Sequence, residues 1–349
     1  GGAERVMLNL AKGLVLAGHK PHIFCLESRV DHDNSAEIPV YILYENKKLR
    51  QVVSRFNIHN SAKKLEGLVG GIVERNGPFN LYLANLDPTN KLVSKCDFRG
   101  MYYVLHSSVA QEIARDRELG PIKYFNKVQA KRVVNGKDSI AVSEGVSQEA
   151  KATNIISPRP VKTTYNPCDF DVVRELSKGL NAEIPSYPYL IHVGRVVKQK
   201  CHDVLFKALK LVPDIKLVLL CKDVDKVRRI AKKYGVEDRV ITPGFTVNPY
   251  NRGANAALMV LSSDFAGLPT VLVGLLICNT PVVSTDCKFA PREMLTSDMA
   301  DFIVPVGDYV ASGNKIRQVV VLPPNVIGAP ILGKVTLASA VKKYIALAN

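Results

Sequence analysis

Two cations follow a short apolar run in the second half of the sequence, and their types and spacing suit a phosphate. Arg195 comes directly after Gly194, and Lys200 follows in the same basic segment. A guanidinium binds phosphate as a planar fork, and an ammonium binds it as a point charge. If the apolar run is a strand of a parallel sheet, both cations lie beyond its carboxyl end, where such sheets bind ligands. The pair predicts a diphosphate site, with a solvated basic loop as the alternative.

A second candidate site begins at a glycine and a proline that follow another apolar run. Gly267 permits an unusual turn, and Pro269 suits the first helical position because an amide proton there would have no helical partner. Such a helix start would aim the amides of Leu268, Thr270 and Val271 at a ligand. A well-capped core helix is the alternative.

Two further candidates lie in the first half of the sequence. Gly1 and Gly2 stand directly before a helical pattern, where unpaired amides favour an anion, although a plain turn has the same appearance. His106 ends an apolar run and precedes two serines, which places it at the carboxyl end of a predicted strand. A structural or exposed histidine is the alternative there.

The elements that must position these residues form two arrays of short apolar runs alternating with helical patterns. In the first array we expect strands at residues 22–26, 40–44, 81–84, 100–105 and 139–142 and helices at 4–17, 49–74 and 122–134. In the second array we expect strands at residues 189–193, 216–220, 239–242, 257–261 and 281–284 and helices at 201–211, 222–234 and 269–278. This order is typical of parallel strands with helical crossovers. It predicts an α/β fold of two tandem Rossmann-like domains that face each other across a cleft.

Prolines and a weak apolar period at residues 167–188 indicate a linker between the two arrays. We expect an N-terminal acceptor-side domain at residues 1–166, whose first strand would precede the given sequence. The linker at 167–188 leads to a nucleotide-binding domain at 189–330 and to a final helix at 331–349 that can pack back on the N-terminal domain.

Composition narrows the class of protein. The 349 residues are 47% hydrophobic and 23% charged, which excludes disorder, and no apolar run approaches the roughly 18–20 residues of a membrane span. The net charge of +15 favours an anionic partner. The seven cysteines form no CxxC, so we expect reduced thiols in a cytosolic protein.

No carboxylate cluster or Asp-x-Asp run is well placed for a metal, so we expect no metal and no other cofactor. A GxGxxG after a strand and any nucleic-acid-binding signature are also missing, which argues against an NAD-dependent enzyme and a nucleic-acid partner.

A basic and apolar stretch at residues 47–65 is a candidate membrane surface. Its cations alternate with apolar residues in a way that would make a helix basic on one side and apolar on the other. We expect it to contact an anionic membrane, with an ordinary solvated amphipathic helix as the alternative. The cations are Lys47, Lys48, Arg50, Arg55, Lys63 and Lys64, and the apolar residues are Leu49, Val52, Val53, Phe56 and Leu65.

At these motifs the chain resembles the retaining glycosyltransferases of family 4, which have the GT-B fold. The resemblance is carried, in family order, by Ile-His-Val-Gly-Arg at 191–195, Lys-Gln-Lys-Cys-His-Asp at 198–203, Pro-Gly-Phe at 243–245, Leu-Pro-Thr-Val-Leu at 268–272 and Pro-Val-Val-Ser-Thr-Asp at 281–286. It implies a cytoplasmic enzyme, peripheral on the inner face of the cell membrane, that makes a surface polysaccharide or lipopolysaccharide. It also implies a nucleotide-sugar donor linked to UDP or GDP and a glycan or lipid-linked acceptor.

The resemblance also implies roles for single residues. Arg195 and Lys200 would bind the donor diphosphate, and His106 is similar in position to the family's active-site histidine, so these three form the expected catalytic set. Gly1 and Gly2 would approach the donor phosphate from the other domain, and the backbone at Gly244 and Phe245 would lie against the base. The donor-binding set is Gly1, Gly2, Gly194, Gly244, Phe245, Ala266, Gly267, Leu268, Pro269, Thr270, Val271 and Gly274.

The sequence departs from the family at two positions of that set. The family has glutamates where this chain has Ala266 and Gly274, so two charge-assisted contacts to the donor are missing. A nucleotide-sugar-binding protein of the same fold with little or no turnover is therefore the alternative function. If the resemblance is right, restoring both glutamates should raise transferase activity, provided that the pocket has room.

Overall fold

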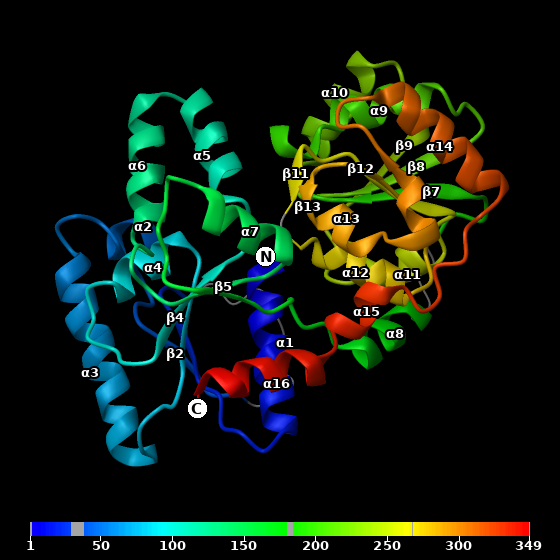
Figure 1. Ribbon diagram of the computed structural model, residues 1–349. Coiled ribbons are helices and arrows are strands. Elements are labelled where there is room, and N and C mark those ends of the chain that lie inside the picture. The colour runs from blue at the N-terminus through cyan, green and yellow to red at the C-terminus, as the bar shows by residue number, and fades with distance from the viewer. Residues whose placement is uncertain (1, 29–37, 180–183, 267, 349) are drawn as a thin grey trace. The chain divides into compact units, whose positions relative to one another are not determined.

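The computed structural model describes residues 2–28, 38–179, 184–266 and 268–348 (Figure 1). The chain divides into two compact units. Unit 1 consists of Gly1–Pro167 and Leu337–Asn349, and unit 2 consists of Cys168–Thr336. Each is described separately below.

Unit 1 is built on parallel strands that form two sheets. The first pairs β1 (Ile23–Cys25) with β2 (Val40–Ile42), and the second has the order β3 (Tyr82–Asn85), β4 (Met101–Leu105), β5 (Ser139–Ala141), β6 (Val161–Thr163). The helices are α1 (Gly2–Leu16), α2 (Leu49–Val52), α3 (Ile58–Asn76), α4 (Asp87–Val93), α5 (Val109–Glu118), α6 (Pro121–Arg132), α7 (Glu144–Ala152) and α16 (Leu337–Ala348).

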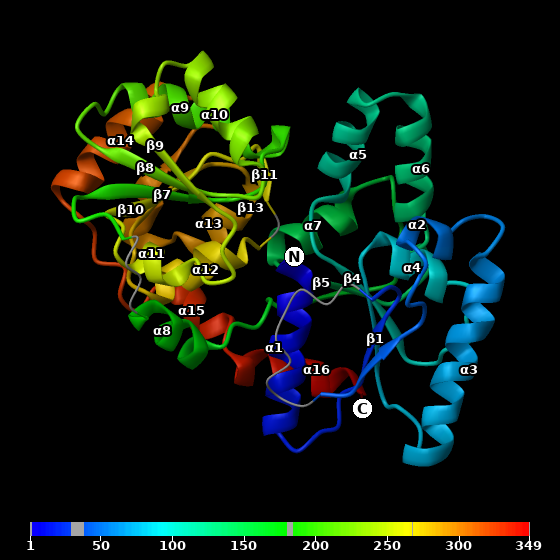
Figure 2. The ribbon, with the colours of Figure 1, turned by 180° about the vertical axis from the view of Figure 1, so that it is seen from behind.

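Helices cover both faces of the unit 1 strands, because successive side chains of a strand point to opposite sides. Tyr102 packs into a cluster with α1 and α16, whereas Tyr103 packs into the larger cluster that includes α3 and α4. Figure 2 shows α1 and α3 on opposite sides of these strands. At Gly13 a Cβ atom would lie 2.8 Å from Val341 Cγ2, so glycine permits the close packing of α1 on α16.

Unit 2 is a doubly wound parallel sheet. Its order is β14 (Ile303–Val304), β12 (Val282–Thr285), β10 (Leu258–Leu261), β7 (Tyr189–Val193), β8 (Lys216–Leu220), β9 (Val240–Gly244), and a separate short pair joins β11 (Phe265–Ala266) to β13 (Lys288–Phe289). The helices are α8 (Phe170–Lys178), α9 (His202–Lys210), α10 (Val224–Lys233), α11 (Tyr250–Ala254), α12 (Thr270–Ile277), α13 (Ala290–Met294), α14 (Tyr309–Val321) and α15 (Pro330–Lys334). Figure 1 shows α9, α10 and α14 on one face of the sheet and α11 and α12 on the other. All four residues of β10 are buried, as expected for a strand covered on both sides.

The predicted α/β fold of two Rossmann-like units is confirmed, although the short strands β6, β11, β13 and β14 were not expected. The other differences lie in the helices. The predicted helix at 49–74 is broken into α2 and α3. The Ser54 hydroxyl and the side-chain amide of Asn57 both donate to the Gln51 carbonyl and compete with helical hydrogen bonds there. Helices α4, α5, α7, α8, α11, α13 and α14 were not expected. Only Val109 and Ile113 of α5 are buried, so its apolar period is weak.

The predicted linker at 167–188 and the predicted helix start at Pro269 also differ from the structure. Most of the described part of that linker belongs to unit 2. Asp169 caps the start of α8, where its side chain accepts from the Val172 amide at 3.2 Å. The Asn248 side chain donates to the Leu176 carbonyl at 2.8 Å and fixes the other end of α8. Pro269 is the residue before α12 rather than its first residue.

Candidate functional site

The predicted phosphate ligands of unit 2 lie on the loop that leaves β7. Arg195 is exposed, and Lys200 is half-buried with its Nζ 3.3 Å from Ser263 Oγ. Burial lowers the pKa of Lys200; Cys287 acts against this shift, and the neighbouring Arg195 acts with it. Within the described ranges neither cation forms an ion pair with a carboxylate. A half-buried lysine beside an arginine, with no carboxylate to neutralise either, favours an anionic ligand.

Hydrogen bonds hold this loop against the loop that follows β10. The Gln199 side chain donates to the Phe265 carbonyl at 2.7 Å, and the Asp264 amide donates to the Gln199 carbonyl at 2.9 Å. The Ser262 hydroxyl donates to the Lys200 carbonyl at 2.7 Å. Lys200 is therefore anchored beside the segment that leads to α12.

Gly194 lies close to two side chains of the site. A Cβ atom there would lie 3.3 Å from His192 Nε2 and 3.5 Å from Lys200 Cε, so a side chain would press on both. His192 Nδ1 is 2.9 Å from the Val260 carbonyl, while its Nε2 is buried without a partner in the described part of the chain. Burial lowers the pKa of His192 to about 3, so the ring is neutral at pH 7.

A third cation and an exposed ring lie at the same edge of the sheet, since they follow β8 and β9. Lys222 Nζ lies 4.7 Å from the centre of the Phe245 ring, which is 59% exposed. Gly244 has φ +98°, a conformation that glycine adopts without strain, and it turns the chain towards Phe245. We call Arg195, Lys200 and Lys222 the cationic edge. The sequence analysis did not name Lys222 as a site residue. Its position two residues after the end of a predicted strand was a usable signal.

The start of α12 is partly described. Leu268 is buried, and Pro269, Thr270 and Val271 are partly exposed. Gly267 and the side chain of Ala266 lie outside the described residues, so their predicted roles stay predictions. The first amides of a helix have no helical partners, which leaves Thr270 and Val271 suited to an anion.

Gly274 lies inside unit 2 and has no room for a side chain. A Cβ atom there would collide with the Tyr250 ring, and Tyr250 is itself buried. A glutamate at position 274 would have to displace that ring. The gain of activity on restoring both glutamates stays a prediction, and at position 274 it requires the Tyr250 ring to move.

In unit 1, His106 follows β4 as predicted and meets a partner from the neighbouring strand. His106 Nε2 is 2.9 Å from Oδ1 of Asn85, the last residue of β3. Burial and then the charge of Lys131 lower the pKa of His106 to about 4, so the ring is neutral at pH 7. Sequence reasoning missed Asn85, although a polar residue at the end of the next strand was the available signal.

A buried group of charges lies beside His106, and we call it the ionic cluster. Lys131 Nζ lies 2.8 Å from Asp87 and 2.9 Å from Glu112, and Lys127 Nζ lies 3.0 Å from Asp87 and 3.3 Å from Glu112. Burial raises the pKa of Glu112, but Lys131 and the Ser107 hydroxyl outweigh it and bring the pKa to about 2. The cluster joins α4, α5 and α6 and holds the loop after β4. Its charges are compensated internally.

The remaining predicted residues are placed as follows. Gly2 is the first residue of α1 and is exposed, and Gly1 lies outside the described residues. In the stretch at 47–65, Val52 and Leu65 are buried in the core of unit 1, whereas Phe56 is 90% exposed. The ammonium groups of Lys47 and Lys64 both lie over the Tyr44 ring, at 4.3 and 4.2 Å from its centre. Most of the apolar side chains of this stretch therefore pack inward.

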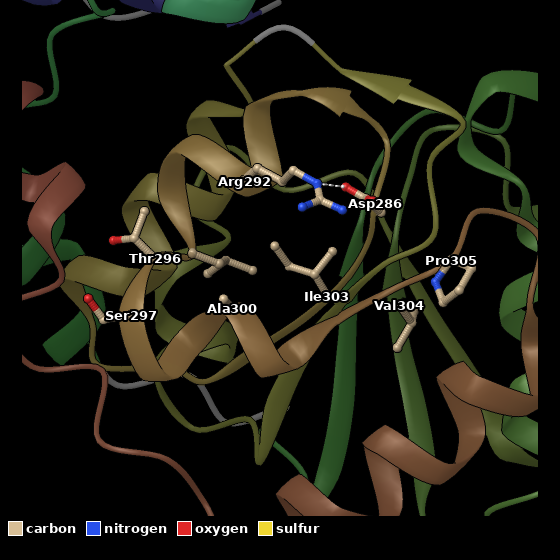
Figure 3. A pocket seen from close by; sticks show the side chains of 9 residues that line it. Asp286, Arg292, Thr296, Ser297, Ala300, Ile303, Val304 and Pro305 are labelled. Carbon is tan, nitrogen blue, oxygen red and sulfur yellow. Dashed lines mark hydrogen bonds and ion pairs between the residues drawn. The ribbon is translucent and has the colours of Figure 1, made fainter.

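Unit 2 also contains a pocket of about 410 Å³ near the end of β12 (Figure 3). Arg292 Nε donates to Asp286 Oδ1 at 2.7 Å at its rim, and Ile303 and Ala300 line it. None of the predicted donor residues lines this pocket.

The described ranges hold no group of three or more His, Cys, Asp or Glu side chains arranged for a metal ion. None of the helices found there is long and apolar enough to cross a bilayer. All seven cysteines are free thiols.

Comparison with known proteins identifies what the chain is similar to. Residues 174–325 match the family model of glycosyl transferases group 1. The chain is 31% identical over 167 residues to the N-acetylgalactosamine-N,N'-diacetylbacillosaminyl-diphospho-undecaprenol 4-alpha-N-acetylgalactosaminyltransferase of Campylobacter jejuni, covering 47% of this chain and 45% of that protein. It is 22% identical over 203 residues to the lipopolysaccharide 1,6-galactosyltransferase of Salmonella typhimurium, covering 55% of each. The chain thus spans about half the length of these curated relatives.

Solved structures are similar over nearly the whole chain. Anabaena Alr3699/HepE in complex with UDP-glucose has a TM-score of 0.73 at 18% identity, covering 99% of this chain and 95% of that one. A glycosyltransferase from Rickettsia africae has a TM-score of 0.69 at 16% identity, covering 100% and 94%. The chain therefore has the fold of the GT-B glycosyltransferases, and residues 174–325 of its second unit match the glycosyl transferases group 1 model.

Proposed function

We propose that this chain is a retaining glycosyltransferase that moves a sugar from a nucleoside diphosphate to a hydroxyl of a glycan or lipid-linked acceptor. The observation that carries the proposal is the cationic edge, where Lys200 is half-buried beside Arg195 and neither meets a carboxylate in the described ranges. A diphosphate supplies the missing negative charge at this edge.

The donor is a nucleotide sugar linked to UDP or GDP. The similar structures of Anabaena Alr3699/HepE hold UDP-glucose or UDP, which supports UDP as the nucleotide of the donor. The exposed Phe245 ring beside Lys222 offers a flat apolar surface for the base.

The chemical step breaks the bond between the sugar and the diphosphate and forms a bond from the same sugar carbon to the acceptor hydroxyl oxygen, whose proton passes to the leaving diphosphate. Negative charge then grows on the leaving phosphate, and Arg195, Lys200 and the first amides of α12 stabilise it. His106 of unit 1 contacts the donor sugar as a neutral imidazole. We expect no metal requirement, so EDTA should leave the rate unchanged.

Relatives support the class of acceptor. By their names, one acts on an undecaprenol-linked glycan and another on lipopolysaccharide. We therefore propose a surface glycan or lipid-linked acceptor, reached at the inner face of the cell membrane.

Calorimetry with UDP and GDP tests the donor site. Replacing Arg195 and Lys200 together with Ala should weaken nucleotide binding by well over tenfold, since each charge-assisted hydrogen bond contributes about 1.5–3 kcal/mol. The matched control is Lys210→Ala, which removes an exposed cation from the end of α9. Equal affinity in the double variant and the control would place the nucleotide elsewhere.

Ala266 and Gly274 favour a second candidate, a nucleotide-sugar-binding protein without turnover. A glutamate at position 274 would have to displace the Tyr250 ring, so the chain as it stands lacks the contact that the family makes there. A transfer assay with UDP and GDP sugars and an undecaprenol-linked acceptor separates the two candidates. Product formation, with the anomeric configuration read by NMR, would rule out the second one.

A further inference from the structure

Three neighbouring strands of unit 2 end level with one another. β7, β8 and β9 are adjacent and parallel in the sheet, with β8 in the middle. Val193 at the end of β7 pairs with Leu220 at the end of β8, and Leu220 pairs with Gly244 at the end of β9. The three loops that follow therefore leave the sheet side by side, along one line across its edge.

These loops present different chemistry in a fixed order along that line. The loop after β7 carries Arg195 and Lys200, the loop after β8 carries Lys222, and the loop after β9 carries Phe245. Since paired strands lie about 4.8 Å apart, β7 and β9 are separated by about 10 Å. A nucleoside diphosphate spans a comparable distance from its diphosphate to its base. A nucleotide whose phosphates meet the first two cations therefore brings its base to Phe245 and Lys222.

The side chain of Lys222 keeps its hydrogen-bonding capacity for a ligand. It is exposed, and within the described ranges its ammonium group forms neither an ion pair with a carboxylate nor a hydrogen bond. The contrast is Lys226 of the following helix, whose Nζ donates to the Val196 carbonyl at 2.8 Å. Lys222 therefore presents three N–H donors at the edge of the sheet.

The place of this ammonium group over the Phe245 ring determines which part of a base it meets. Lys222 Nζ lies 4.7 Å from the ring centre, over one face of the ring. Aromatic rings prefer offset stacking, with their centres about 4.5–7 Å apart. A base stacked in this way on the same face lies beside the ammonium group and roughly level with it. Because a carbonyl oxygen accepts hydrogen bonds close to its own plane, Lys222 can donate to an exocyclic oxygen of that base.

An ammonium group distinguishes bases by their exocyclic groups, because it has donors and no acceptor. Uracil has the carbonyl oxygen O4 and guanine has O6, whereas cytosine and adenine carry an amino group at the corresponding position. The oxygen accepts a hydrogen bond from Lys222. The amino group instead sets donor against donor, and the hydrogen bond is lost.

We propose that Lys222 selects the base of the donor, by donating a hydrogen bond to O4 of uracil or O6 of guanine stacked on Phe245. This inference rests on the proposed function and adds to it that cytosine and adenine nucleotides are rejected. The tasks along the edge are then separate. Arg195 and Lys200 bind the diphosphate whatever the base is, and Lys222 reads the base.

Calorimetry with UDP and CDP tests the inference, because these nucleotides share their ribose and diphosphate and differ only in the base. Their affinity ratio therefore cancels any general effect of charge on phosphate binding. The unaltered protein should bind UDP at least about tenfold more tightly than CDP. Lys222→Met keeps the length of the side chain without its donors, and it should bring the two affinities to within about twofold. Lys222→Glu supplies an acceptor for the cytosine amino group and should make CDP the preferred nucleotide.

The matched control is Lys232→Met, which removes an exposed cation from α10 of the same unit and should keep the ratio of the unaltered protein. An unchanged ratio in Lys222→Met, with UDP still bound, would overturn the inference and leave the proposed donor site intact. In that case an equal loss of affinity for UDP and CDP would make Lys222 a contact of the shared ribose or diphosphate. An unaltered chain that binds no nucleoside diphosphate would overturn the proposed function and this inference together.

Discussion

At the scale of single residues, the Tyr250 ring takes the space that a side chain at position 274 would need. The contrast is Gly67 in α3, which is exposed and has no atom within 4 Å of the place that a Cβ would take. We expect Gly274→Ala to lower the free energy of unfolding by about 1–3 kcal/mol through overpacking. Gly67→Ala should raise it by about 0.5–1 kcal/mol, because alanine costs less backbone entropy in a helix. Urea unfolding measures both, and an unchanged Gly274→Ala variant would contradict the packing of Tyr250.

A second prediction at this scale concerns His106 and its partner Asn85. We expect His106→Ala to lower kcat by at least about a hundredfold, within the range attributed to positioned side chains, and to leave UDP binding to unit 2 unchanged. Asn85→Ala should lower kcat less, because the ring stays in place but loses the partner that orients it at 2.9 Å. Steady-state kinetics and calorimetry separate the two effects. Weakened UDP binding in either variant would argue against this division of roles.

At the scale of elements, the stretch at 47–65 is a basic surface with one prominent apolar side chain, Phe56. Its contact with an anionic membrane would therefore be mainly electrostatic, at about 1 kcal/mol for each cation, and would fade as salt rises. We expect sedimentation with phosphatidylserine vesicles at low salt and a loss of binding when five cations are replaced by Gln. The five are Lys47, Lys48, Arg50, Lys63 and Lys64.

The control for this experiment removes the same amount of charge from unit 2. It replaces five exposed cations with Gln, namely Lys210, Arg228, Arg229, Lys232 and Lys233. Equal sedimentation of the two variants would leave residues 47–65 as ordinary solvated helices.

At the scale of the whole molecule, three buried neutral histidines make stability depend on pH. Burial lowers the pKa of His106 and His202 to about 4 and that of His192 to about 3, from 6.5. The unfolded chain binds protons at these residues near pH 6.5 while the folded chain does not, so the free energy of unfolding falls as pH drops from 6.5 towards 4. Each histidine contributes a slope of up to about 1.4 kcal/mol per pH unit.

Urea unfolding at pH 7.5, 6 and 5 measures this slope. His106 contributes to the pH dependence of the stability of unit 1, whereas His192 and His202 contribute to that of unit 2. A variant with His192→Asn and His202→Gln should therefore lose the slope in unit 2 and keep it in unit 1. A wild-type protein equally stable at pH 7.5 and 5 would contradict the burial of these rings.

The sequence by itself determined the class of fold and the position of most of its longer strands. Runs such as residues 189–193 and 216–220 coincide with β7 and β8, because strands buried on both faces must be continuously apolar. It also placed Arg195 and His106 beyond the ends of strands, since local order alone decides which residue follows a strand. Side-chain bonds of Ser54 and Asn57 broke a helix that the apolar period made continuous.

Only the tertiary structure decided which residues meet. Each of three contacts in the sites is between residues far apart in the sequence, and no local pattern records it. The Tyr250 ring lies against Gly274, Asn85 lies beside His106, and Lys200 lies beside Ser263 with no carboxylate partner in the described ranges. Local periodicity specifies elements, whereas packing and hydrogen-bond satisfaction between elements specify sites.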